Sequence, residues 1–393
     1  MVESIASGRK GPGNGGARVL VPTLRGFDRC VFRGTGYEAQ DVLAEIDRVD
    51  LLELKPGPHF AFQERLVRNL AWHDPMGLAA SCNPGLQRVR LKQDYDLLVL
   101  YCQHKHLTEL LYVNAIQEWT RRCRKSVCIL DEIWANDAYA LRHHLKRLQQ
   151  FDAVVVGLQG SVGAVSEVIG RQCHFVPSAV DVWRFTPLRK PARNRTVDIF
   201  SIGRREQGIH RKLLEFAHER DLFYVFDTYG GGDAACPDYR LHREMMANIL
   251  HHSRCFMVAP ALVDMLHHAN GQIEVPNRFY EGAAAGAILL GRRPQCEYFD
   301  GLFGWPDSVV EIREDGSDAA EVLSALLADP ERCRGISQRN AAESLLRHDW
   351  VYRWKTIYEL VGLDPTPAMK SREIRLREVA DSAGYVSDEA LPA

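Results

Sequence analysis

Short apolar runs rich in Val, Ile and Leu recur along the chain, and segments with apolar residues at helical spacing separate many of them. Short runs of this kind are typical of buried strands, and their alternation with helices predicts parallel sheets covered by helices on both faces. The first half has such runs at residues 18–22, 51–55, 96–101, 126–130, 153–157 and 174–177. A second series follows at residues 197–202, 223–226, 255–259, 287–290 and 309–312.

Amphipathic spacing predicts helices over residues 107–122, 138–150, 210–220, 239–252 and 319–327, and one long or broken helix over residues 336–363. The polar, Pro-containing stretch 188–195 lies between the two series of strands and is interpreted as a linker. Two Rossmann-like halves joined there would enclose a cleft between the carboxyl ends of their strands. The topology alone therefore predicts a binding site in that cleft.

The segment 275–291 carries the most specific chemistry: a loop, a short helix and then a buried strand. Pro276 suits the first helical turn and Gly286 suits the position just past the helix end. A helix that starts at the carboxyl edge of a sheet favours a phosphate, and Arg278 adds a formal charge there. Glu281 lies one turn further on, so the pair fits a nucleotide: a cation for phosphate and a carboxylate for ribose hydroxyls. The alternative is an Arg–Glu helical pair at i,i+3.

Composition narrows the class of protein. A length of 393 residues predicts two or three domains, and a formal charge of −2 argues against a dedicated nucleic-acid binder. No run approaches the roughly 18 apolar residues of a membrane span. Residues 1–16 are polar and Gly-rich, which indicates a flexible tail rather than a signal peptide. Ten scattered cysteines without a C-x-x-C pair are typical of a reduced, cytoplasmic protein.

The second half resembles the group 1 glycosyltransferases of GT-B fold, in particular the branch with an R-x-x-E-x-x-A-x-G-A core. The residues that match this core are Arg278, Glu281, Ala284, Gly286 and Ala287. Further similarities follow the family's order: the interdomain joint at 174–187, the strand and Gly-Arg turn at 198–204, and the closing segments at 326–330 and from 349 onward. The resemblance implies an α/β fold of two Rossmann-like domains facing across a cleft, with a C-terminal helix crossing back to the first domain.

The implied division of the chain has five parts. They are a flexible tail (1–16), an acceptor domain (17–187), a linker (188–195), a nucleotide-sugar donor domain (196–345), and C-terminal helices with a tail (346–393).

The resemblance also implies roles for individual residues. Glu281 would hold the ribose, while Gly203 and Arg204 would meet the donor diphosphate, with Arg204 also stabilising the leaving group. Arg278 and its neighbour Asn277 join this predicted donor site. The family's next basic residue is ambiguous here, because Arg205, Arg211 and Lys212 all lie near its place.

One departure from the family concerns the donor sugar. Many relatives carry a glutamate eight positions before the ribose glutamate, and that position here is Ile273. Glu274 is one residue out of register. It either substitutes through a shifted loop, or the sugar contact is absent.

The first domain offers candidates for acceptor binding and catalysis just past its predicted strands. Asp131 and Glu132 end an apolar strand, where two carboxylates are costly unless water or a ligand meets them. His104 is a further catalytic candidate, with a solvated loop histidine as the alternative. The basic clusters 121–125 and 143–147 fit either a solvated face or a peripheral contact with an anionic membrane or acceptor.

The predicted function is therefore sugar transfer from a nucleotide-diphosphate sugar, as co-substrate, to an unidentified acceptor. The resemblance implies retention of configuration, and we expect no metal ion and no separate cofactor. Asp94 and Asp96 match an Asp-x-Asp metal motif but precede a buried strand, so a strand-entry turn is expected. A nucleotide-sugar epimerase of the same fold and a non-catalytic nucleotide-sugar-binding protein are the alternatives.

Overall fold

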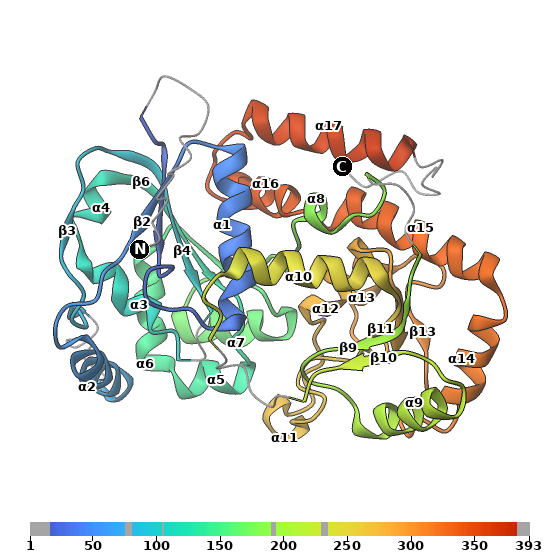
Figure 1. Ribbon diagram of the computed structural model, residues 1–393. Coiled ribbons are helices and arrows are strands. Elements are labelled where there is room, and N and C mark those ends of the chain that lie inside the picture. Colours follow the sequence, from blue (N-terminus) through green and yellow to red (C-terminus); the bar gives the residue numbers. More distant parts are fainter. Residues whose placement is uncertain (1–15, 75–80, 104–105, 190–193, 229–234, 383–393) are drawn as a thin grey trace, which may run out of the picture.

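Two parallel β-sheets flanked by helices form the frame of the protein in the computed structural model (Figure 1). The structure describes residues 16–74, 81–103, 106–189, 194–228 and 235–382. The first sheet has the order β2 (Val49–Glu53), β1 (Val19–Thr23), β4 (Tyr95–Cys102), β6 (Cys123–Leu130), β7 (Ala153–Val156) and β8 (His174–Phe175). The second has the order β10 (Tyr224–Phe226), β9 (Val197–Ser201), β11 (Ser253–Val258), β12 (Ile288–Gly291) and β13 (Val310–Glu311). This arrangement confirms the predicted α/β fold of two Rossmann-like domains.

Each apolar run predicted as a strand overlaps one of these strands. The central strands are buried along most of their length, as parallel strands covered on both faces must be. A small separate ladder pairs β3 (Val89–Arg90) with β5 (Ile116–Gln117).

The helices of the first domain are α1 (Gly34–Ile46), α2 (Phe60–His73), α3 (Glu109–Tyr112), α4 (Trp119–Arg122), α5 (Ala135–Ala140), α6 (Arg142–Leu145) and α7 (Val162–Ile169). Those of the joint and second domain are α8 (Val182–Phe185), α9 (Gln207–Glu219), α10 (Tyr239–His252), α11 (Leu266–Ala269), α12 (Asn277–Ala284), α13 (Phe299–Phe303) and α14 (Ala319–Leu327). The chain closes with α15 (Pro330–Arg347), α16 (Trp350–Leu360) and α17 (Pro367–Ser382). Both α10 and α14 have the bounds that the periodicity predicted.

Two stretches that were each predicted as one helix are divided into several shorter elements. Residues 107–122 form α3, a 3-10 turn, β5 and α4, because Glu118 adopts a left-handed conformation (φ 56°) and β5 pairs with β3. Residues 138–150 are divided among α5, α6 and a 3-10 segment, with the break at Leu141 (φ −94°, ψ 13°). In both stretches the apolar spacing is helical, but tertiary pairing and local backbone geometry interrupt the helix.

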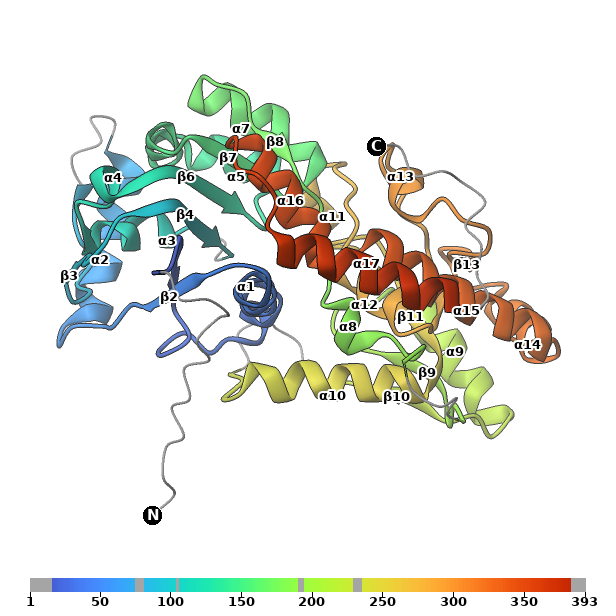
Figure 2. The same ribbon diagram turned by 90° about the horizontal axis from the view of Figure 1, so that it is seen from above.

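The C-terminal helices return to the first domain (Figure 2). The break between α15 and α16 falls at Asp349, whose side chain accepts the Val351 N–H at 2.9 Å and caps α16. Trp354 donates its indole N–H to the carbonyl of Ala39 on α1 at 3.1 Å, and the Tyr358 hydroxyl donates to Asp47 at 2.7 Å. The last helices therefore tie the two domains together.

Some of the expectations reach beyond the described residues. The predicted tail overlaps residues 1–15, and the predicted linker includes 190–193, both of which lie outside the described ranges. Within those ranges, every helix is too short or too polar to cross a bilayer.

Candidate functional site

A tight turn follows β9 at the carboxyl edge of the second sheet. Gly203 has φ +70°, the left-handed region that glycine adopts without strain, and its N–H donates to the Asp227 carboxylate at 2.9 Å. Arg205 donates to the Asp227 carbonyl at 2.7 Å and forms an ion pair with its carboxylate. Asp227, just past β10, thus fixes both the turn and Arg205.

Arg278, in the first turn of α12, lies directly against the Gly203 turn. Its Nη1 donates to the carbonyl of Arg204, and a Cβ at position 203 would lie 2.6 Å from its Nη2. Pro276 is the residue before the helix rather than part of its first turn, so the predicted start is one residue early. Burial lowers the pKa of Arg278 to about 10, and the neighbouring Glu281 partly opposes that shift. The turn and the helix start therefore place a cation at the edge of the sheet.

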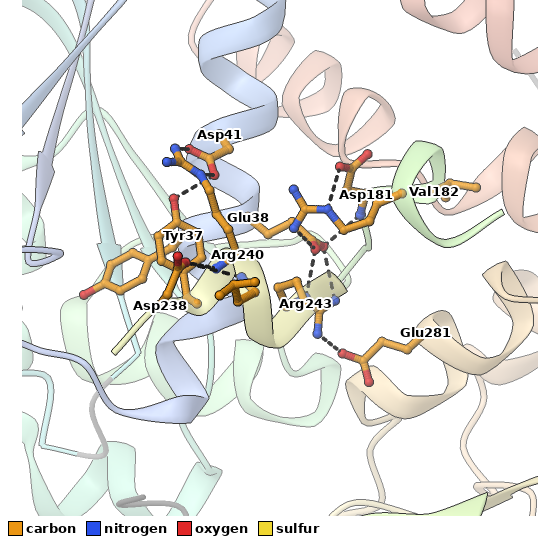
Figure 3. Close-up of polar contacts among 12 residues, drawn as sticks. Tyr37, Glu38, Asp41, Asp181, Val182, Asp238, Arg240, Arg243 and Glu281 are labelled. Carbon is orange, nitrogen blue, oxygen red and sulfur yellow. Dashed lines mark hydrogen bonds and ion pairs between the residues drawn. The ribbon is translucent and has the colours of Figure 1, made fainter. Parts of the chain in front are cut away.

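Glu281 lies one helical turn beyond Arg278 and is 7% exposed. Its carboxylate pairs with Arg243 of α10, which also holds Glu38 of α1 (Figure 3). The alternative interpretation, an ion pair between Arg278 and Glu281, does not describe this arrangement, because each side chain contacts a different group. A carboxylate and a cation thus stand one turn apart with separate partners.

Glu274 is fully buried and faces the first domain. Its carboxylate accepts the N–H of Gly160 at 2.8 Å, the N–H of Gln159 at 3.2 Å and the hydroxyl of Tyr298 at 2.5 Å. The amide of Gln272 adds a fourth hydrogen bond at 2.7 Å. Both oxygens of Glu274 therefore take part in hydrogen bonds, two of which cross the domain boundary, and its contact with a donor sugar stays a prediction.

The other predicted donor residues occupy different positions. Arg204 is exposed and pairs with Asp264 through hydrogen bonds of 2.8 and 3.0 Å. Lys212 pairs with Glu215 on the exposed side of α9, and among the described contacts it does not reach the turn. Asn277 contacts the hydroxyl of Ser178 in the joint between the domains. Of the basic residues after Arg204, Arg205 is the one built into the turn.

In the first domain, Asp131 follows β6 and accepts hydrogen bonds from the Tyr101 hydroxyl at 3.1 Å and the Gln103 amide at 3.0 Å. Burial raises its pKa to about 6. It borders a cavity of about 20 Å³, lined also by Trp350 and Arg353 of α16. Glu132 is exposed and accepts the indole N–H of Trp134 at 3.2 Å. His104 lies outside the described residues.

Sequence reasoning missed Glu38 and Arg243, which the structure joins to Glu281. A signal for Arg243 was present: it occupies the apolar stripe of α10 with Met246, Ala247 and Leu250. An arginine on a buried stripe requires a partner. The Asp-x-Asp match lies at the start of β4, where Asp94 pairs with Arg122 and Asp96 with Arg18.

Comparisons with known proteins give a match of part of the chain to one family model, and matches of fold to solved structures. Residues 204–359 match a family model described as glycosyl transferase-like. This match spans Arg204, Arg278 and Glu281 and extends into α16. No curated protein matches the chain.

Solved structures share the fold at low sequence identity. An alpha-glucosyltransferase in complex with UDP has a TM-score of 0.51 at 10% identity, over 88% of this chain and 99% of that chain. An alpha,alpha-trehalose-phosphate synthase (UDP-forming) from Burkholderia vietnamiensis has a TM-score of 0.49 at 13% identity, over 95% and 100%. A putative UDP-N-acetylglucosamine 2-epimerase from Listeria monocytogenes has a TM-score of 0.47 at 10% identity, over 89% of this chain and 98% of that chain. The structural similarity to the alpha-glucosyltransferase supports the GT-B fold.

Proposed function

We propose that this protein is a glycosyltransferase that moves a sugar from a nucleotide-diphosphate sugar to an acceptor bound on the first domain. The observation that carries the proposal is the convergence of three features at one sheet edge. These are the left-handed turn at Gly203, Arg278 packed against that turn, and Glu281 one helical turn further on. The family-model match over the same region supports the transfer class. UDP is the first nucleotide to test, because it occupies the alpha-glucosyltransferase of similar fold.

The chemistry requires cations at this place. As the glycosidic bond breaks, negative charge builds up on the leaving diphosphate, and fixed positive groups stabilise that charge. Arg278 and the N-terminus of α12 supply a charge and a dipole within the site. Arg204 is held by Asp264 at the exposed edge of the same turn and can reach phosphate oxygens with its planar fork. Glu281 is assigned to the ribose hydroxyls.

The acceptor and the stereochemistry belong to the proposal as well. The resemblance supports retention of configuration, and Asp131 and Glu132 are the first-domain carboxylates assigned to acceptor contact. Asp131 is enclosed by Tyr101, Gln103 and α16, which favours a role in shaping the sheet edge over direct proton transfer. Glu132 is the more accessible of the two.

The transfer step is also proposed to need no divalent metal, because arginine side chains and a helix terminus provide the positive potential for the diphosphate. The purified protein is incubated with UDP-sugars, and then with GDP- and TDP-sugars, each with and without excess EDTA. We expect slow release of free nucleoside diphosphate without acceptor, and little loss in EDTA. Conversion of the donor into an isomeric nucleotide sugar would instead support the epimerase. Activity abolished by EDTA and restored only by magnesium or manganese would contradict the metal-free site.

A further inference from the structure

A buried ionic cluster joins the two domains and includes the candidate ribose carboxylate. Its members are Glu38 of α1, Arg243 of α10 and Glu281 of α12, which are 0%, 3% and 7% exposed. Figure 3 shows Arg243 between the two carboxylates, one from each domain. A guanidinium enclosed in this way is shielded from bulk solvent, so its geometry depends on these two partners.

Arg243 divides its donors unequally. Its Nε donates to Glu38 Oε2 at 2.8 Å and its Nη2 donates to Glu38 Oε1 at 3.2 Å, so one whole edge of the fork is used by Glu38. Its Nη1 contacts Oε1 of Glu281. Among the described residues, no hydrogen bond reaches Oε2 of Glu281. One oxygen of Glu281 is therefore held, and the other is left for a ligand.

Glu38 is itself held at the joint between the domains. The N–H of Asp181 donates to its Oε1 at 2.8 Å, and Arg184 lies 3.7 Å from its Oε2. The guanidinium of Arg243 also stacks over the ring of Phe185, 4.8 Å from its centroid. These contacts keep the carboxylate of Glu38 facing Arg243.

We propose that Glu38 is a positioning residue for the nucleotide. By occupying one edge of the Arg243 fork, it prevents Arg243 from pairing with both oxygens of Glu281. That keeps Oε2 of Glu281 available to the ribose hydroxyls. Without the Glu38 carboxylate, Arg243 turns its free edge to Glu281 and competes with the ribose. The inference rests on the proposed function and adds that ribose recognition in the second domain depends on a first-domain side chain.

The test measures binding of UDP, GDP and ADP, each compared with its 2′,3′-dideoxy counterpart, by calorimetry on the full-length protein. Glu38→Gln keeps the size of the side chain and removes its charge. For the nucleotide that binds wild type best, we expect Glu38→Gln to weaken ribonucleotide binding about 5- to 20-fold. Binding of the dideoxy nucleotide should change less than about twofold, because that ligand makes no hydrogen bond to Glu281. Arg243→Lys keeps the charge but loses the fixed geometry that holds Oε1 of Glu281, so it should show the same ribose-specific loss.

Asp41→Asn is the matched control. Asp41 is also on α1 and pairs across the same domain boundary with Arg240, at 2.9 Å, and with Tyr239, at 2.7 Å. Among its contacts with the described residues there is none to Arg243, so the ribose preference should remain at the wild-type value.

If wild type binds one of the three nucleotides, three outcomes would overturn the inference. Equal losses for both ligands in Glu38→Gln and Arg243→Lys would show a general structural role, and unchanged binding in both would show no role. A ribose-specific loss in Asp41→Asn of the same size would assign the effect to the domain boundary as a whole. Failure of wild type to bind any of the three nucleotides would instead reject the proposed function, and this inference with it.

Discussion

Individual side chains at the two sheet edges have different electrostatic surroundings. In the second domain, Arg278 lies beside Arg204 and Arg205, and the acidic partners of these two arginines lie at the same turn after β9. In the first domain, Asp131 lies among neutral donors and aromatic residues after β6. The edge in the second domain is the one proposed to bind a phosphate, whereas the edge in the first domain disfavours a buried charge.

Asp131 gives a prediction about pH. Burial raises its pKa from 3.8 to about 6, so the folded protein retains this proton to higher pH than the unfolded chain. The corresponding stabilisation is present below the unfolded pKa and is lost as pH rises through about 6. Asp131→Asn removes the titration. The free energy of unfolding of the variant, relative to wild type, should therefore rise by about 2 kcal/mol between about pH 4 and about pH 7.5.

Denaturant unfolding at both pH values measures this difference. A constant offset between variant and wild type across the range would contradict a raised pKa for Asp131.

At the scale of elements, the sequence predicted the strands well and the irregular segments poorly. Strands β4, β6 and β11 are buried on both faces, so each appears as a continuous apolar run. The helix over 107–122 failed because the left-handed residue Glu118 and the β3–β5 pairing have no marker in the periodicity. Arg278 and Glu281 were identified from helix position, but the partners of Glu281 come from α1 and α10, distant in sequence.

The turn between β9 and α9 can be tested through its close approach to α12. Gly203→Ala places a Cβ 2.6 Å from Nη2 of Arg278, so the arginine must move. We expect nucleoside diphosphate binding to weaken about 10-fold, while binding of the free nucleoside changes little, since phosphate contacts are lost. Calorimetry with both ligands measures the two effects.

Gly170→Ala is a matched control, because Gly170 has nearly the same backbone angle (φ +72°) and a Cβ added there would meet no described atom within 4 Å. In Gly170→Ala, as in Gly203→Ala, the free energy of unfolding should fall by about 1 kcal/mol. Nucleotide binding by Gly170→Ala should match that of wild type. Equal losses of nucleoside and nucleoside diphosphate binding in Gly203→Ala would contradict a phosphate site at this turn.

At the scale of the whole molecule, the C-terminal helices and the joint hold the domains through buried charges. Arg372 of α17 is 4% exposed and binds both oxygens of Asp349 at 2.8 Å, with Asp181 at 2.7 Å and Glu45 at 3.0 Å. The resemblance implied that these helices cross back, but no sequence pattern pointed to Arg372. Its partners come from the joint, α1 and the α15–α16 break, so only the folded chain brings them together.

Arg372→Met should lower the free energy of unfolding by about 3–5 kcal/mol, because it leaves buried carboxylates without their cation. Lys355→Met is the comparison, since Lys355 joins α16 to Glu373 of α17 at 2.8 Å in a more exposed pair. Its loss should cost less than about 1 kcal/mol. Chemical denaturation measures both, and equal effects of the two substitutions would contradict a dominant role for the Arg372 cluster.

The central claim is that Glu281 holds the ribose of a nucleotide-diphosphate donor, and calorimetric titration of UDP and other nucleoside diphosphates into wild type and Glu281→Ala tests it most directly. A carboxylate that accepts hydroxyl hydrogen bonds contributes about 1.5–3 kcal/mol, so binding should weaken roughly 10- to 150-fold in the variant. Circular dichroism checks that the variant is folded. Unchanged affinity in folded Glu281→Ala would remove Glu281 from the nucleotide site and contradict the account.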